Sequence, residues 1–197
     1  MVTVQSGEFL KEQVLEPFLR YFRIRKAINY IKLYPNCTLL DIGCGFEARL
    51  LLAAEPYIGQ GFGIDRRAPK LCNSKIKTIK SDFGQKLPFD DQTIDFITLL
   101  AVLEHIDDDL NMLKECSRIL RPGGGMLLTV PSWRAKPILE FLSLRLNLVN
   151  KEEILDHKRY YSKEDLLILC SKVPNLEITF HQYFQFKCNN QLFIKKT

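Results

Sequence analysis

The segment at residues 40–47, LDIGCGFE, constrains the fold of this chain more than any other. A short apolar stretch at residues 38–42 runs into Gly43 and Gly45, and a helical pattern at residues 48–55 follows and is closed by Pro56. Glycine in such a turn lets the backbone approach a bound nucleotide closely, because a Cβ atom would collide with it. The segment therefore predicts a strand, a ligand-binding turn and a helix, in that order.

The strand-and-helix pattern then repeats, with further strands expected at residues 61–64, 76–79, 94–100 and 126–130. The stretch 94–100 is almost wholly apolar, as is typical of a central parallel strand buried on both faces. After it, Asp107 or Asp108 is expected to cap a helix that is stopped by the Arg-Pro-Gly sequence at residues 121–123. This alternation predicts an open parallel sheet covered by helices on both faces.

The C-terminal part follows a different pattern. After a helix at residues 162–171, the stretch 176–186 alternates like a strand, Asn189 and Asn190 are expected to form a turn, and residues 191–195 return as a last strand. The fold class predicted is thus α/β, a Rossmann-like, seven-stranded and mostly parallel sheet with an antiparallel C-terminal hairpin. We expect a single domain over residues 1–197, with an N-terminal helical segment at residues 1–35.

Composition and charge exclude several classes of protein. No stretch approaches the ~20 apolar residues that span a bilayer, and the N-terminus has no secretory pattern. The six cysteines are scattered, as is typical of free thiols in a reducing compartment. We therefore expect a cytoplasmic protein. The net charge of +5 permits an anionic partner but forms no dense basic stripe, so no stable nucleic-acid partner is expected.

Residues 17–32 form a basic amphipathic pattern with no acidic residue. Such a helix either meets an anionic substrate or a membrane surface, or packs on the sheet with a solvated cationic face. Peripheral membrane contact thus stays open, as does the choice between a monomer and a homodimer.

Three acidic residues at strand ends suggest a nucleotide-type cofactor. Asp65 ends the second strand, and its carboxylate accepts the hydrogen bonds that the two hydroxyls of a ribose donate. Asp82 and Phe83 follow the third strand and suit an adenine, whose amino group donates and whose faces stack. Asp41, two residues before the first glycine, can serve the ammonium of a methionine moiety.

The turn also fits the dinucleotide fingerprint G-x-G-x-x-G/A, with Asp65 where an NAD enzyme keeps its ribose acid. An NAD-dependent oxidoreductase is therefore the competing interpretation. Asp41, Asp82 and the segment RILRPGGG at residues 118–125 weigh against it.

The stretches LLDIGCG, GIDRR, SDFGQKLPFDDQTIDFITLLAVLEHIDD and ILRPGGGMLLTVPS resemble the class I S-adenosylmethionine-dependent methyltransferases, and in particular their small-molecule branch, type 11. The resemblance covers residues 39–130. It implies S-adenosylmethionine as cofactor and transfer of its methyl group to a small-molecule acceptor.

The resemblance also assigns the cofactor contacts: the glycines back the amino-acid part, Asp41 its ammonium, Asp65 the ribose, and Asp82 with Phe83 the adenine. The full set expected is Asp41, Gly43, Cys44, Gly45, Asp65, Arg66, Asp82, Phe83, Leu100 and Ala101. Glu47 departs from the family, which usually has a third glycine there. No metal site is expected.

Candidate catalytic residues follow the fourth strand and precede the last helix. His105 lies at the carboxyl end of the sheet, where ligands bind in open α/β folds. His157 and Tyr161 belong to a stretch, HKRYYS, that resembles the His-x-Arg-x-Tyr stretch of the family. Each of the three either contacts the acceptor or only fixes its loop.

The insertion at residues 132–161 carries much apolar surface outside the sheet. One interpretation is a helical lid over an apolar or lipid-like acceptor; the other is an extra helix packed on the core or on a second subunit. A Leu-Leu-Ala-Val sequence at residues 99–102 replaces the Asn/Asp-Pro-Pro-Tyr motif of nucleobase amino-methylation. A non-catalytic cofactor-binding subunit remains a third class.

Overall fold

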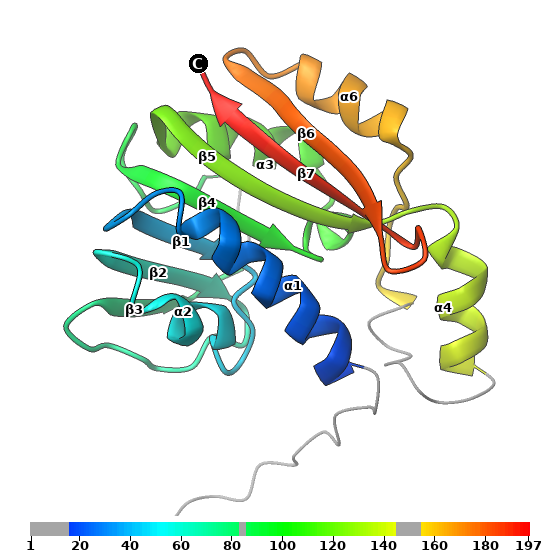
Figure 1. The fold of residues 1–197 in the computed structure, drawn as a ribbon, viewed down its shortest axis with the longest axis horizontal. Helices are drawn as coiled ribbons and strands as arrows, with labels where there is room; N and C mark the ends of the chain where they lie inside the picture. Colours follow the sequence, from blue (N-terminus) through cyan, green and yellow to red (C-terminus); the bar gives the residue numbers. More distant parts are fainter. Residues whose placement is uncertain (1–15, 83–85, 145–154) are drawn as a thin grey trace, which may run out of the picture.

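A computed structural model describes residues 16–82, 86–144 and 155–197 of the chain. Its centre is a seven-stranded sheet in the order β3-β2-β1-β4-β5-β7-β6 (Figure 1). The strands are β1 (Thr38–Ile42), β2 (Gln60–Asp65), β3 (Ile76–Lys80), β4 (Ile94–Leu100), β5 (Leu120–Pro131), β6 (Leu176–Phe184) and β7 (Asn189–Lys196). The first five are parallel, while β7 runs antiparallel to both β5 and β6. The predicted fold class is confirmed.

The turn of the C-terminal hairpin differs from the prediction. Asn189 and Asn190 are paired strand residues of β7, opposite Phe184 and Tyr183 of β6. The chain instead reverses just before them, where Gln185, Phe186 and Lys187 all adopt positive φ. The Asn190 side chain is buried and donates a hydrogen bond to the carbonyl of Tyr161, which is why it stays in the strand.

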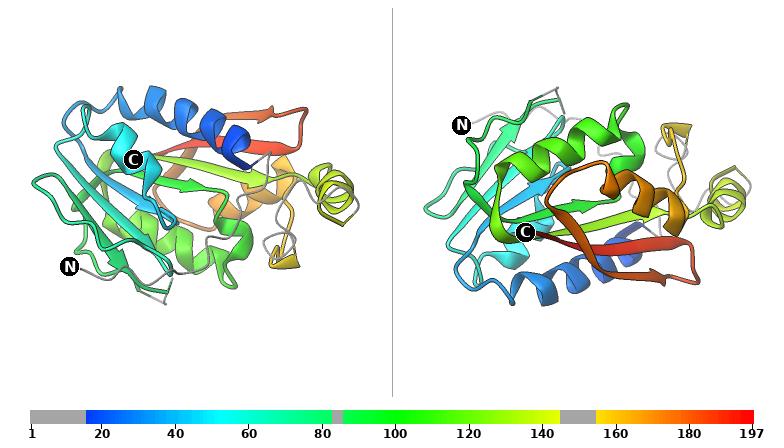
Figure 2. Two further views of the ribbon diagram at one scale, coloured as in Figure 1. Left: turned by 90° about the horizontal axis from the view of Figure 1, so that it is seen from below. Right: turned by 90° about the horizontal axis from the view of Figure 1, so that it is seen from above.

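Helices cover both faces of the sheet (Figure 2). On one face α1 (Glu16–Ile31) and α2 (Arg49–Ala54) share a core with β1 and β4, and on the other α3 (Asp109–Ile119) and α6 (Lys163–Ser171) pack over β4, β5 and β7. Each of these four helices buries one apolar side against the sheet.

Helices α3 and α6 begin at the expected caps. The carboxylate of Asp108 accepts a hydrogen bond from the backbone N–H of Asn111. Ser162 and Asp165 form a reciprocal capping box, in which each side chain accepts from the other's backbone N–H. The two caps fix the chain on either side of the site described below.

The order of the strands reverses between β1 and β4. β2 and β3 lie on one side of β1, while β4 and β5 lie on the other. Connections therefore leave the carboxyl ends of β1 and β4 in opposite directions, and ligands of open α/β sheets bind in the crevice this creates.

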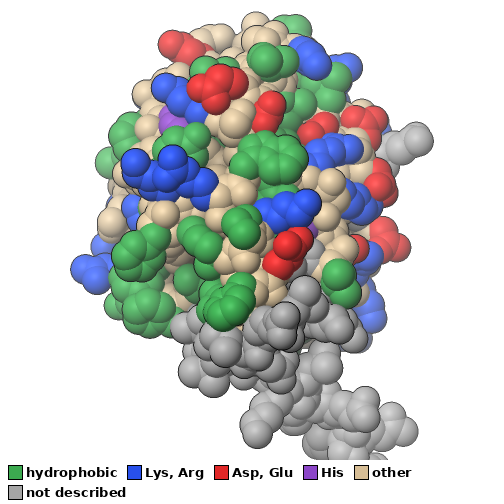
Figure 3. All heavy atoms as spheres, turned by 90° about the vertical axis from the view of Figure 1, so that its right-hand side faces the viewer, with side chains coloured by type: hydrophobic (Ala, Val, Ile, Leu, Met, Phe, Trp, Pro, Cys, Tyr) green, Lys and Arg blue, Asp and Glu red, His purple; other side chains and the backbone are tan. Residues whose placement is uncertain are grey.

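Helix α4 (Ala135–Leu144) stands at one end of the molecule, beyond the end of the sheet (Figure 2). Trp133, Ile138 and Phe141 are about half exposed on and beside it. Hydrophobic side chains interspersed with Lys and Arg mark this side of the molecule (Figure 3). Within the described ranges, no helix is long and apolar enough to cross a membrane.

Candidate functional site

The glycine turn after β1 is shaped by two residues with positive φ, Gly43 at 79° and Gly45 at 70°. A Cβ atom on Gly43 would lie 2.2 Å from Cγ2 of Val102, so the turn is packed against the loop after β4. A Cβ on Gly45 would meet no atom within 4 Å. One glycine therefore allows close packing inside the protein, and the other leaves open space on the outer side of the turn.

Asp65, the last residue of β2, holds this turn. Its carboxylate accepts hydrogen bonds from the backbone N–H of Gly45 at 3.0 Å and of Arg67 at 2.7 Å. Because a carboxylate has about four lone-pair sites, both bonds leave acceptor capacity for hydroxyl donors. The carboxylate thus lies directly beside the open side of Gly45.

Asp41 lies in the middle of the sheet, opposite Thr98 of β4. Its side chain is buried, and its Oδ1 accepts a hydrogen bond from the Thr98 hydroxyl at 2.6 Å. Burial raises the pKa of the Asp41 carboxyl to about 7, an effect that the Thr98 hydrogen bond opposes and the nearby Asp65 increases. A cationic ligand group at this end of β1 would favour the ionised form.

The raised pKa of Asp41 predicts a pH-dependent stability. The ordinary pKa of an aspartate is about 4, whereas the pKa of Asp41 in the folded protein is about 7. Between these two pH values the unfolded chain has lost the Asp41 proton and the folded chain still holds it. The free energy of unfolding therefore falls as the pH rises through this range. Asp41→Asn should therefore gain stability relative to the parent across that range. Urea unfolding at several pH values measures the difference. The exposed Asp82→Asn serves as control, and a pH-independent difference for Asp41→Asn would contradict the assignment.

The family's third glycine is replaced by Glu47, and the structure accommodates the change. Glu47 has no positive φ; the left-handed residue is its neighbour Ala48, at 48°. The Glu47 carboxylate pairs with Arg49 at 2.5 Å, with its side chain 38% exposed. The substitution thus leaves the turn at Gly43 and Gly45 free of a bulky side chain.

The remaining cofactor candidates lie around the same end of the sheet but differ in exposure. The Cys44 side chain is buried against β2, and burial raises the pKa of its thiol to about 12, so only its backbone faces the turn. Arg66 and Asp82 are exposed and 3.7 Å apart. Phe83 falls outside the described residues.

The fourth strand ends in a sharp bend. Leu100 is the last residue of β4, and Ala101 adopts φ 59° while donating its N–H to the carbonyl of Thr129. The chain thereby leaves the sheet and forms the short helix η1 (Leu103–His105). Leu100 and Ala101 thus lie at the carboxyl end of β4, the strand that pairs with β1, and their contact with the cofactor stays a prediction.

His105 and His157 meet at this bend, with ring centroids 4.9 Å apart. His105 Nδ1 lies 2.9 Å from a carboxylate oxygen of Asp156, and His157 Nδ1 lies 3.3 Å from the Tyr160 hydroxyl. Burial, together with the neighbouring His105, lowers the pKa of His157 to about 4, so its ring is neutral near pH 7. The structure thus brings together two of the three catalytic candidates.

Tyr161 lies apart from this pair. It is buried, donates its hydroxyl to Asp109 at 3.0 Å, and its backbone N–H bonds the carbonyl of Pro131. These contacts favour its alternative role, in which it anchors the loop. The loop is further fixed by an N–H···O bond from Lys158 to the carbonyl of Glu104 and by the Arg159–Asp109 ion pair.

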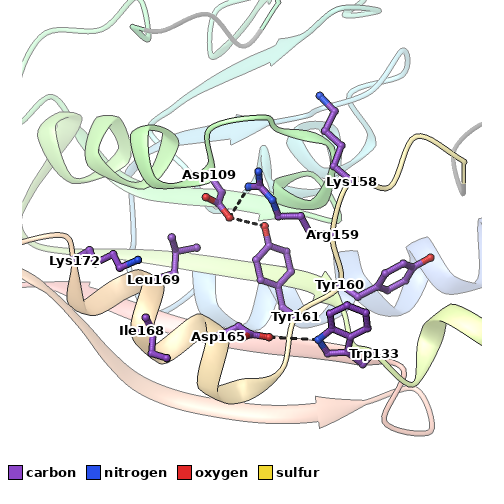
Figure 4. Close-up of a pocket in the computed structure, with 10 residues that line it drawn as sticks. All are labelled: Asp109, Trp133, Lys158, Arg159, Tyr160, Tyr161, Asp165, Ile168, Leu169 and Lys172. Carbon is purple, nitrogen blue, oxygen red and sulfur yellow. Dashed lines mark hydrogen bonds and ion pairs between the residues drawn. The ribbon is translucent and has the colours of Figure 1, made fainter.

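An open groove of about 510 Å³ lies beside this loop (Figure 4). The rings of Trp133 and Tyr160 lie next to each other on one side of it, with centroids 6.0 Å apart. The Tyr160 ring in turn contacts that of His157, at 5.5 Å. Four rings, from Trp133 through Tyr160 and His157 to His105, therefore form an aromatic row between the groove and the end of β4.

Two partners in the site carry no signal in the sequence pattern: Thr98 lies within an apolar strand, and Asp156 lies 51 residues beyond His105. Glu104 follows the fourth strand next to His105, where ligands are expected, but its burial was not predicted. Glu104 is in fact only 1% exposed. The register between β1 and β4 and the return of the loop before α6 bring these residues into the site, and neither can be predicted from the spacing of nearby residues.

The arrangement fits S-adenosylmethionine. The turn at Gly45 leaves open space, the Asp65 carboxylate beside it has acceptor capacity for ribose hydroxyls, and the buried carboxyl of Asp41 gains from a cationic group. All three lie at the carboxyl ends of β1 and β2, next to the switch point of the sheet.

Comparison with known proteins agrees with this geometry. Residues 40–128 match the family model described as a methyltransferase domain. The chain is 26% identical over 151 residues to a protein of Mycolicibacterium smegmatis named "Probable S-adenosylmethionine-dependent methyltransferase", covering 69% of this chain and 58% of that protein. It is 24% identical to a ubiquinone biosynthesis O-methyltransferase of Aliivibrio fischeri, covering 66% and 59%.

Solved structures share the fold. An S-adenosylmethionine-dependent methyltransferase from Aquifex aeolicus superposes with a TM-score of 0.64 at 18% identity, covering 88% of this chain and 89% of that one. The cyclase SpnF gives 0.65 at 14% identity, covering 87% and 80%. The chain spans a little under three fifths of the length of the two sequence relatives. Residues 40–128 thus match a methyltransferase domain, and in its motifs, its sheet and these matches the chain is similar to the class I S-adenosylmethionine-dependent methyltransferases.

Proposed function

We propose that this chain transfers a methyl group from S-adenosylmethionine to a small apolar acceptor that carries a hydroxyl group. The observation that carries the proposal is the convergence of Asp41, Gly45 and Asp65 at the switch point, next to the histidine pair at the end of β4. When bound, S-adenosylmethionine supplies an electrophilic methyl group. The protein then has mainly to align the acceptor oxygen and exclude water.

In this proposal the loop after β4 provides the base. Asp156 binds Nδ1 of His105, which holds the ring in one orientation and leaves Nε2 to take the proton of the acceptor hydroxyl. His157 stays neutral and packs against His105, while Tyr161 anchors the loop through Asp109. Asp156 is thus a positioning residue rather than a catalytic one.

The aromatic row supports an apolar acceptor. Its rings offer flat, apolar faces beside a groove, and the exposed hydrophobic residues of α4 lie at the same end of the molecule. Two relatives are named for quinone substrates: the ubiquinone biosynthesis O-methyltransferase above and a demethylmenaquinone methyltransferase of Bacillus cereus. The latter is 27% identical over 114 residues, which cover 52% of this chain and 48% of that protein. We propose that the insertion at residues 132–161 serves as a lid for such an acceptor; its residues 145–154 lie outside the described ranges.

Calorimetric titration with S-adenosylmethionine, S-adenosylhomocysteine and NAD tests the first step. We expect micromolar binding of both adenosyl compounds and no binding of NAD. Binding of NAD alone would overturn the proposal. Affinity for the adenosyl compounds without turnover on a panel of phenolic and quinol acceptors would support a non-catalytic subunit instead, and the same fold is found in a cyclase.

Replacing His105 tests the proposed base. His105→Ala should lower kcat by about 10²- to 10⁴-fold, the usual contribution of a general base, and should leave the affinity for S-adenosylmethionine unchanged. His181→Ala is the matched control, because His181 lies on β6 and bonds Asn190 instead. Equal activity of the two variants would return His105 to a structural role.

A further inference from the structure

One group of side chains at the end of β4 has the composition of a metal site. Glu104, His105 and His157 each offer a ligand atom, and these atoms all lie within 4.8 Å of one another. Two imidazoles and one carboxylate are a ligand set that divalent first-row transition metals accept, with further positions left open. The three residues come from two segments, η1 and the stretch before α6.

The Glu104 carboxyl is an unusual group for a structural role. The residue is 1% exposed, and its Oε2 has no hydrogen-bond partner among the described residues. A buried polar atom without a partner destabilises the fold, and native structures rarely keep one without a reason. Burial also raises the pKa of this carboxyl to about 8, and a bound cation would reverse that shift.

One ring nitrogen of each histidine already has a partner, and the other is left for a metal ion. Nδ1 of His105 is engaged by Asp156 and Nδ1 of His157 by the Tyr160 hydroxyl, so Nε2 is the nitrogen left on each ring. A carboxylate on the far nitrogen is the usual outer partner of a metal-bound histidine, because it fixes the tautomer and makes the ring more basic.

The two segments are also fixed to one another without a metal. The Lys158 N–H bonds the Glu104 carbonyl at 2.9 Å, and Lys158 pairs with Asp107. The side chain of His105 is 20% exposed, which gives a cation a path to the cluster. Arg23 of α1 lies close enough to lower the pKa values of both Glu104 and His157. Its positive charge would repel a bound cation. The negative charge of Asp156 acts in the opposite direction at His157.

We propose that Glu104, His105 and His157 form a binding site for a divalent transition-metal ion such as Zn²⁺, Co²⁺ or Mn²⁺, with Asp156 as the outer partner of His105. The role of the ion in catalysis rests on the proposed function: a hydroxyl acceptor bound at an open position would lose its proton more readily, and the ion would then replace His105 as the group that activates it. Metal binding itself does not depend on methyl transfer.

Titration of the chelator-treated protein with Co²⁺ tests the site directly, because Co²⁺ reports its ligands by visible absorption. We expect one equivalent to bind, with ligand-field bands and no thiolate charge-transfer band. His105→Asn and Glu104→Gln should each abolish the bands or weaken binding at least tenfold, and Asp156→Asn should weaken it about 10- to 100-fold. His105→Asn is the safer variant, since its side chain is partly exposed.

Two controls separate this site from adventitious binding. His181→Asn, at the third histidine of the chain, and Cys72→Ser, at an exposed thiol, should leave the bands unchanged. Arg23→Gln should bind Co²⁺ more tightly than the parent. Absence of Co²⁺ binding, or binding that survives His105→Asn, overturns the proposal. If the protein binds S-adenosylmethionine but not Co²⁺, the metal site is refuted and the proposed function stands. If it binds Co²⁺ but not S-adenosylmethionine, the metal site stands and the proposed function is refuted.

Discussion

Gly43→Ala should destabilise the fold and abolish cofactor binding together. The new methyl group would require an alanine at φ 79°, at a cost of about 1–2 kcal/mol, and would lie 2.2 Å from Cγ2 of Val102. Val102 is only 6% exposed and has little room to move, so overpacking adds about 1–3 kcal/mol. We expect a loss of about 2–5 kcal/mol in the free energy of unfolding, measured in urea, and no detectable binding of S-adenosylmethionine by calorimetry.

Gly45→Ala is the matched control for this prediction. Its φ of 70° imposes the same backbone cost, but its methyl group meets no protein atom within 4 Å. It should therefore lose only the backbone contribution to stability, while its methyl group obstructs the cofactor. Adding Val102→Ala to Gly43→Ala removes the two nearest contacts and should restore part of the stability. Equal stability of the two single variants would show that packing against Val102 is unimportant.

Asp65→Ala should weaken binding of S-adenosylmethionine by about 2–4 kcal/mol, the worth of two charge-assisted hydrogen bonds, or about 30- to 900-fold in Kd. Part of this loss comes from the turn, because the same carboxylate accepts the N–H groups of Gly45 and Arg67. Calorimetry of the parent and the variant measures the change.

A truncated ligand shows which part of the cofactor Asp65 binds. 5′-Methylthioadenosine keeps the ribose but lacks the amino-acid part, so Asp65→Ala should weaken its binding by the same factor as that of S-adenosylmethionine. Asp41→Asn should weaken only the latter. Asp82→Ala should have a small effect, since that side chain is 86% exposed. Unchanged affinity in Asp65→Ala would mean that the ribose site lies elsewhere.

The local order of the chain was predictable from its sequence. Strands β1 and β4 begin and end at the predicted residues, because an apolar run that stops at Gly43 and a nearly continuous apolar run at residues 94–100 are strong signals. Asp108 and Ser162 cap their helices as expected. The hairpin turn was wrong, because Asn189 and Asn190 favour turns by residue type while the burial of Asn190 and its bond to Tyr161 decide the matter.

The positions of the glycine turn and of Asp65 were easier to predict from the sequence than the positions of the residues around His105. Gly43, Gly45 and Asp65 lie in or next to one strand end each, where motif spacing determines position. A contact between residues far apart in the chain depends on how the insertion returns to the sheet, which no periodic pattern in the sequence predicts. This applies to the group formed by Glu104, His105, Asp156 and His157.

The insertion is fastened at its base. Ser132 forms a β-bridge with Tyr161, and the Lys158 N–H donates to the Glu104 carbonyl. The two ends of the insertion therefore lie side by side, just after the end of β5. Segments between two such anchors tolerate changes of length at little thermodynamic cost. Changes in the residues between the two anchors would therefore leave the histidine pair and the turn at Gly43 and Gly45 in place.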